Sequence, residues 1–231
     1  MGPSPAAFVR QFDPGRSHRA LRILRHRWIS GSDLVALFVV LRYMVDTAGS
    51  IEGFFLGGYR PEAEDIGSAL DHFCTRARGV DLRGVYPGAE TRQGVWYFFP
   101  KPSDGSGCKR LNLYLRWMVR RDHIDLGTWS RVDRSKLVVP LDTHVIRVGQ
   151  CLKLTSYRSP GWPMAREITQ TLRLLGLTIY YNYYQLGALW QRDVFQNIYG
   201  NIYTAERRGR SFQSLKSIGE TVNGNASIET S

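Results

Sequence analysis

The sequence predicts an all-α fold, on the basis of its residue pattern and its composition. Apolar residues recur at helical spacing in several segments, some of which begin at a capping residue or end at a glycine. The 231 residues are 43% hydrophobic, which is enough to bury one good core or two small subdomains. We therefore expect a helical bundle that is followed by an irregular C-terminal tail.

The first 50 residues combine a basic run with an apolar helix. The run from His18 to Arg27 fits a basic helix resting on DNA or a solvated face, and both interpretations stay open. Ser32-Asp33 is expected to cap a helix that extends to about Ala48 and ends at Gly49. Its expected core face consists of Leu34, Leu37, Phe38, Leu41 and Val45.

A third helix is expected from Pro61 to Arg78, with acidic residues in its first turn and Ala69, Leu70 and Phe73 facing inward. Glycines and prolines then exclude a long helix between residues 79 and 107. The aromatic segment from Val95 to Phe99 lies inside this irregular connection. It could wall a pocket that stacks on an extruded base, or it could be a hydrophobic plug that closes the core, and the plug is the preferred interpretation.

The turn from Gly105 to Cys108 leads into Lys109 and a fourth amphipathic helix, whose apolar series is Leu111, Leu115 and Met118. Lys109 is expected in the first turn. There the positive end of the helix dipole and the neighbouring Arg110 disfavour the protonated amine, and partial burial would lower its pKa further. A neutral amine is a nucleophile, so Lys109 is a candidate catalytic residue.

A fifth helix is expected to begin at Asp142 as its N-cap, with Val145, Val148 and Leu152 following at helical spacing. Backbone N–H groups would then hold the Asp142 carboxylate. Asp142 lies 33 residues after Lys109, a spacing that permits the two side chains to share a cleft. A last helix is expected from Met164 to Leu175.

The C-terminal part differs in composition from the rest of the chain. Residues 176–210 form an aromatic-rich extension, and residues 211–231 are rich in Ser, Asn, Gly and Thr and are expected to be a disordered tail. Residues 1–175 therefore make up the expected helical region.

Charge and cysteine content suggest where the protein acts. Thirty-one Lys and Arg against twenty Asp and Glu give a net charge of +11, which is typical of proteins that bind a phosphate backbone. Three scattered cysteines offer no disulfide framework, and the histidines show no metal-binding spacing, so we expect a cytoplasmic protein without metal or cofactor. The longest apolar run is too short to cross a bilayer, and no signal peptide is recognised.

Two motifs, Ser106–Arg120 and Pro140–Arg147, resemble an uncharacterised bacterial family, the domain of unknown function 2400. The likeness extends from Ser4 to about Leu175. More distantly, both motifs are similar to the helix-hairpin-helix DNA glycosylases, and their spacing resembles the archaeal 8-oxoguanine branch. This resemblance implies a glycosylase-like helical bundle that is incomplete at its N-terminus. It also implies that Lys109 matches the Schiff-base lysine and Asp142 the essential aspartate.

Our leading hypothesis is a base-excision repair DNA glycosylase with AP lyase activity on a damaged purine, such as 8-oxoguanine. A monomer would bind double-stranded DNA, with Lys109 attacking C1′ and Asp142 stabilising positive charge on the sugar. The candidate DNA-contacting cations are Arg110, Arg116, Arg120 and Arg147, and the candidate base pocket comprises Trp96, Phe98 and Cys108. The alternatives are a non-catalytic nucleic-acid-binding protein and a truncated, inactive relative on the same scaffold.

Overall fold

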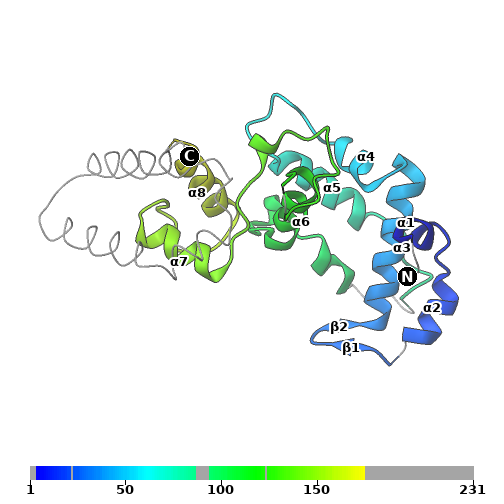
Figure 1. The fold of residues 1–231 in the computed structure, drawn as a ribbon. Coiled ribbons are helices and arrows are strands. Elements are labelled where there is room, and N and C mark those ends of the chain that lie inside the picture. Colours follow the sequence, from blue (N-terminus) through cyan, green and yellow to red (C-terminus); the bar gives the residue numbers. More distant parts are fainter. Residues whose placement is uncertain (1–3, 22, 87–93, 123, 175–231) are drawn as a thin grey trace, which may run out of the picture. The chain divides into compact units, whose positions relative to one another are not determined.

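A computed structural model describes residues 4–21, 23–86, 94–122 and 124–174, and this part of the chain is mostly helical (Figure 1). Its two short strands form one antiparallel pair. The α-helices are α1 (Pro5–Arg10), α2 (Pro14–Leu21), α3 (Gly31–Ala48), α4 (Ile51–Leu56), α5 (Gly67–Arg78), α6 (Lys109–Val119), α7 (Thr143–Cys151) and α8 (Trp162–Leu174). Short 3-10 helices are η1 (Gly94–Phe98), η2 (Pro102–Asp104) and η3 (Arg134–Lys136).

The chain forms two compact units, Met1–Pro140 and Leu141–Ser231. Helices α1 to α6 belong to the first unit, and α7 and α8 belong to the second. The prediction of a mostly α-helical protein is confirmed. The expected aromatic-rich extension of residues 176–210 and the expected tail of residues 211–231 lie outside the described residues.

The basic run near the N-terminus does not form a single helix. Helix α2 ends at Leu21, and β1 (Arg25–His26) pairs with β2 (Ile29–Ser30) in a short hairpin. Arg27 occupies the turn with a φ of 55°, in the left-handed region that a tight two-residue turn requires. The hairpin therefore carries several of the basic residues into solvent.

Helix α3 is held at both ends by local chemistry. Ser30 is its N-cap: its hydroxyl accepts from the Asp33 backbone N–H at 3.3 Å, and the Asp33 carboxylate accepts from the Ser30 backbone N–H at 2.7 Å. Gly49 ends the helix in the left-handed region, with a φ of 73°. The cap thus begins two residues earlier than the expected Ser32-Asp33 start.

The expected core face of α3 is wrong. The buried apolar side chains of α3 are those of Val35, Ala36, Val40 and Met44, each fully inaccessible, whereas the residues of the expected stripe are half-buried. Because α3 is apolar on most of its circumference, hydrophobic spacing alone does not select the innermost side. The half-buried side is partly covered by other elements, as where Phe12 stacks on Phe38 with ring centroids 4.9 Å apart.

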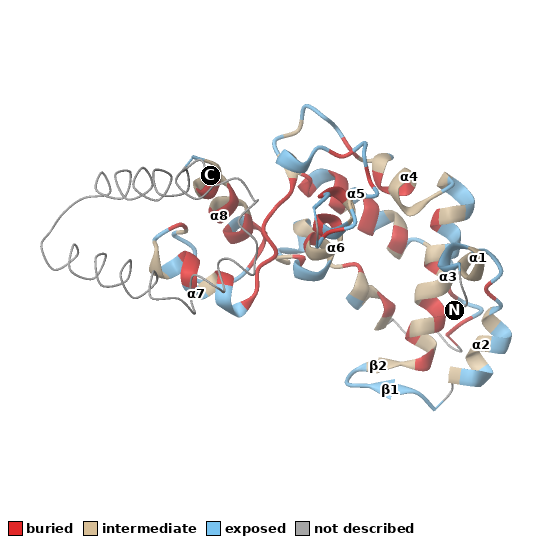
Figure 2. Cartoon of the chain, viewed as in Figure 1, coloured by how far each residue is buried: buried red, intermediate tan, exposed pale blue. Residues whose placement is uncertain are grey.

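Helices α4 and α5 complete the aromatic core of the first unit. The expected inward residues of α5 are confirmed, since Ala69 and Leu70 are 1% exposed and Phe73 is 5% exposed. Figure 2 shows buried residues along α5. Phe73 contacts Phe54 edge to face, with centroids 5.5 Å apart. Helix α5 begins at Gly67 rather than at Pro61, because the intervening residues form turns.

The second unit packs α7 against α8. Gly149 makes close contact possible, because a Cβ at this position would lie 2.7 Å from Cδ1 of Ile168. Glu167 ties α8 to the preceding loop: its carboxylate accepts from the Thr155 hydroxyl at 2.6 Å and from the Ser156 backbone N–H at 2.8 Å. The Thr155 hydrogen bond is the main cause that lowers the Glu167 pKa below its usual value.

Candidate active site

The candidate lysine lies at the first residue of α6, after a turn fixed by short hydrogen bonds. Gly105 closes η2 with a φ of 77°, and Cys108, with a φ of 47°, is the N-cap of α6. The buried Asn112 donates through Nδ2 to the Gly107 carbonyl at 3.2 Å, which holds the turn against the helix. Sequence reasoning missed Asn112, although a polar residue one turn into an apolar helix face is a signal of a local backbone contact.

Lys109 itself is exposed. The partial burial considered from the sequence is therefore not found at Lys109. What remains of the sequence argument is the position at the helix N-terminus next to the exposed Arg110. Cys108 supplies no side-chain cap to α6, so its thiol does not satisfy the first amides of the helix.

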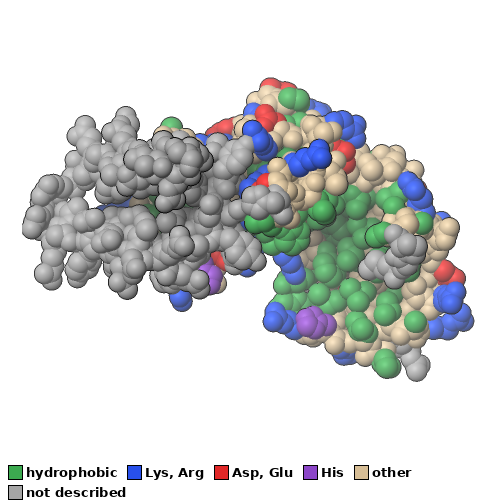
Figure 3. Space-filling model, in the orientation of Figure 1, with side chains coloured by type: hydrophobic (Ala, Val, Ile, Leu, Met, Phe, Trp, Pro, Cys, Tyr) green, Lys and Arg blue, Asp and Glu red, His purple; other side chains and the backbone are tan. Residues whose placement is uncertain are grey.

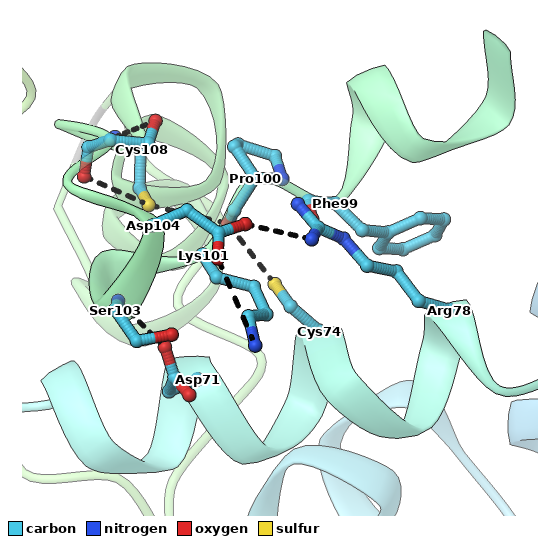
Figure 4. Close-up of polar contacts among 10 residues, drawn as sticks. Asp71, Cys74, Arg78, Phe99, Pro100, Lys101, Ser103, Asp104 and Cys108 are labelled. Atoms are coloured by element: carbon cyan, nitrogen blue, oxygen red, sulfur yellow. Dashed lines mark hydrogen bonds and ion pairs between the residues drawn. The ribbon is translucent and has the colours of Figure 1, made fainter. Parts of the chain in front are cut away.

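The thiols of Cys74 on α5 and of Cys108 before α6 meet at one backbone carbonyl, that of Pro100 (Figure 4). The Sγ atoms of Cys74 and Cys108 both contact the Pro100 carbonyl oxygen at 3.3 Å, as hydrogen-bond donors. Arg78 adds a bond of 2.8 Å to the Phe99 carbonyl. Burial raises the pKa of the Cys108 thiol to about 11 and that of Cys74 well above its usual range. Cys108 is 2% exposed, so it acts as a buried anchor, and its expected place in a base pocket is not supported by exposure.

The aromatic segment is divided between the core and the surface. Val95 and Phe99 are buried, at 1% and 4% exposed, as the preferred plug interpretation requires. Trp96 and Phe98 are half-buried, and Tyr97 is 40% exposed. Within the described residues, the Trp96 Nε1 donor is buried without a hydrogen-bond partner. An unpaired buried donor costs about 1–3 kcal/mol of stability.

Arg110 joins the aromatic segment to the start of α6. Its guanidinium carbon lies 3.6 Å from the Tyr97 ring centroid, and its Nη2 donates to the Tyr97 carbonyl at 2.9 Å. The structure therefore brings together Lys109, Arg110 and the η1 segment that contains Trp96 and Phe98.

Arg116 and Arg120 have a different environment from Arg110. They are 5% and 7% exposed, and both form ion pairs with the buried Asp125. The Arg116 Nε to Asp125 Oδ2 distance is 3.0 Å, and Arg120 also pairs with Asp122 at 2.7 Å. The expectation that these two arginines expose positive charge beside the site is wrong, because they neutralise a buried carboxylate.

Asp142 takes up its expected position in the second unit. It is the N-cap of α7, it is 5% exposed, and its Oδ1 accepts from the Val145 backbone N–H at 2.7 Å. Arg147 and His144 lie exposed on the same helix. Val145 and Val148 are buried as expected, at 4% and 3% exposed.

The site residues thus fall into two sets. Lys109, Arg110 and the η1 segment belong to the first unit, and Asp142 and Arg147 belong to the second. Across the described ranges, no group of three or more His, Cys, Asp or Glu side chains is arranged to hold a metal ion. Nor does any helix in those ranges combine the length and apolarity needed to cross a bilayer.

Residues 1–178 match the family model described as a protein of unknown function, DUF2400, and the chain belongs to this family. No curated protein and no solved structure matches the chain. The match includes both motifs that carry the candidate lysine and aspartate.

Proposed function

We propose that this protein is a DNA glycosylase with AP lyase activity that removes a damaged purine, such as 8-oxoguanine, through Lys109. The observation that carries the proposal is the placement of Lys109, an exposed primary amine at the first residue of α6, after an anchored turn and beside Arg110 and the η1 aromatics. The cationic helix start suits an adjacent phosphate.

The reaction requires a nucleotide that has left the duplex stack, because C1′ is inaccessible within it. The neutral Lys109 amine would attack C1′ as the glycosidic bond breaks, and the purine would leave with the bonding electrons and a proton. Opening of the sugar ring gives a Schiff base between Nζ and C1′. Loss of a C2′ proton and of the 3′ phosphate then nicks the strand.

Asp142 has a separate role in the proposal. Its carboxylate, oriented by the Val145 N–H, would stabilise the positive charge that develops on the sugar as the base departs. An abasic site has already lost its base, so Asp142 should matter more for excision than for Schiff-base formation at an abasic site.

Borohydride trapping tests the covalent step, because the reagent reduces the imine to a stable secondary amine. The native chain should form an adduct with duplex DNA that carries 8-oxoguanine or an abasic site. Lys109→Gln should form none, while Lys153→Gln, a matched change at an exposed lysine of the second unit, should retain it. An adduct that survives Lys109→Gln, or no adduct from the folded native chain, would refute the proposed nucleophile.

The exposure of Lys109 favours one alternative, a non-catalytic DNA-binding protein, because an exposed lysine next to Arg110 can contact phosphate without a covalent step. This alternative predicts salt-sensitive DNA binding that is retained in Lys109→Ala, with no adduct from any variant. Asp142→Asn separates the cases further. The glycosylase predicts a larger loss of 8-oxoguanine excision than of trapping at a preformed abasic site, whereas the binding protein shows neither activity.

A further inference from the structure

Three segments of the first unit bring an exposed aromatic pair and a stacked arginine onto one surface. Trp28, in the turn of the β1–β2 hairpin, is 61% exposed, and its ring meets that of Tyr97 with centroids 5.3 Å apart and planes at 83°. Arg110 covers the Tyr97 ring from the start of α6, at 3.6 Å. We refer to these residues as the Trp28–Tyr97–Arg110 surface.

The framework of this surface is fixed by buried polar contacts. Asp33 caps α3 directly after the hairpin, and its Oδ1 accepts from the Tyr86 hydroxyl at 2.7 Å. The Tyr86 hydroxyl in turn accepts from the Val95 backbone N–H at 3.4 Å. Asp33 and Tyr86 therefore link the end of the hairpin to the η1 segment, so that the segments carrying the two exposed rings are joined through buried hydrogen bonds.

The exposed charges on the hairpin and at the start of α6 are positive. Residues 25–30 of the hairpin and residues 109–112 of α6 contain no aspartate or glutamate. The nearby Asp33 is buried, and Asp104 pairs with Arg78 at 2.7 Å. Arg25, Arg27, Lys109 and Arg110 are exposed, and the Arg27 guanidinium carbon lies 5.9 Å from the Trp28 ring centroid. Figure 3 shows hydrophobic side chains gathered on one face of the first unit, with cations and a histidine at the edge formed by the hairpin.

Core packing does not account for this arrangement, because Trp28 leaves most of its indole in water. An aromatic side chain flanked by arginines is suited to stack on a nucleobase while the cations contact the neighbouring phosphates. A base inside an intact duplex offers no free face for such stacking. A bulged base, or a base next to an abasic site, does.

We propose that the Trp28–Tyr97–Arg110 surface stacks on an unstacked base of DNA, so that the protein prefers interrupted duplex to intact duplex. The proposal rests on the DNA-binding part of the proposed function but not on the Schiff-base step. Lys109 follows the same turn that presents Arg110, so a base held on this surface would bring its strand to the start of α6.

Fluorescence anisotropy with labelled DNA tests the proposal, using a duplex with a one-nucleotide bulge and the same duplex without it. Trp28→Ala should weaken binding to the bulged duplex by about 5-fold to 150-fold, the range measured for base–aromatic stacking, and should affect the intact duplex little. Trp28→Phe should restore most of the affinity, because it keeps an aromatic face. Tyr43→Ala, a matched change at a 41% exposed tyrosine on α3, should have no effect.

If Trp28→Ala lost the same affinity for the bulged and the intact duplex, the proposal would be overturned, since equal losses indicate phosphate binding without stacking. Unchanged binding by Trp28→Ala would also overturn it. Trapping of the native chain on abasic DNA separates this result from the proposed function. If the native chain forms the adduct but Trp28→Ala binds both duplexes as the native chain does, only the stacking surface is refuted. If Trp28→Ala weakens binding to the bulged duplex but no variant forms an adduct, only the lysine chemistry is refuted.

Discussion

Asp125→Asn tests whether Arg116 and Arg120 stabilise the fold rather than bind DNA. The Asp125 side chain is 0% exposed and lies between two guanidinium groups that are 5% and 8% exposed. Asparagine keeps the shape of the side chain but removes its charge. Arg116 would then remain buried beside a neutral amide, whereas Arg120 would keep its ion pair with Asp122.

The loss of folding stability expected for Asp125→Asn follows from the burial of this ion-pair cluster. Removing one partner of a buried ion pair costs about 3–5 kcal/mol, and the remaining amide oxygen still accepts a hydrogen bond, so we expect about 3 kcal/mol. For a unit of about this size, the change lowers the midpoint of thermal unfolding by roughly 10 °C. This is a large share of the roughly 5–15 kcal/mol that stabilises a typical domain.

Thermal and urea unfolding of Asp125→Asn, followed by circular dichroism, measures this cost. Asp46→Asn is the matched control, because Asp46 pairs with Arg42 on the surface of α3 at 3.4 Å, with both side chains about half exposed. We expect it to change the free energy of unfolding by less than about 1 kcal/mol. If Asp125→Asn were as stable as this control, the two arginines would not depend on the carboxylate, and their assignment as structural cations would fail.

Three further predictions follow from the contacts described. Asp33→Ala should destabilise the first unit by at least about 1–2 kcal/mol in urea unfolding, because α3 loses its cap and Tyr86 loses its acceptor; native stability would contradict this. Glu167→Gln should destabilise the protein at pH 7, and the difference from the native chain should vanish as the pH falls below 4.5. The folded-state pKa of Glu167 is lowered, so its stabilisation is present above the unfolded value and is lost at lower pH; a difference independent of pH would contradict this. Iodoacetamide should label the half-buried Cys151 before Cys74 and Cys108, as read by mass spectrometry, because burial raises the pKa of the latter two thiols; equal labelling rates would rule this out.

Local signals predicted the two helix starts that carry the candidate site. The small-residue turn before Lys109 and the capping pattern at Asp142 both depend on nearby residues, and the structure has helices at both positions. The central α3 helix shows the limit of such reasoning. Its existence was evident, but its buried face depends on which elements pack against it, and the sequence pattern does not contain that information.

Long-range contacts decided the roles of the arginines. Arg110, Arg116 and Arg120 look alike in the sequence, yet Arg110 stacks on Tyr97 while the other two pair with Asp125, which follows α6. A basic segment therefore predicts positive charge but not which cations remain accessible. The sequence likewise did not indicate Trp28 as a surface residue of interest, because its ring contact with Tyr97 joins residues nearly 70 positions apart.

Identifying the residue that borohydride links to DNA is the most direct test of the central claim. The reduced complex with abasic DNA would be digested with protease and nuclease, and the modified peptide sequenced by mass spectrometry. The account predicts a sugar remnant on Nζ of Lys109, in a peptide from the start of α6. A remnant on another residue, or no modified peptide from the folded native chain, would contradict it.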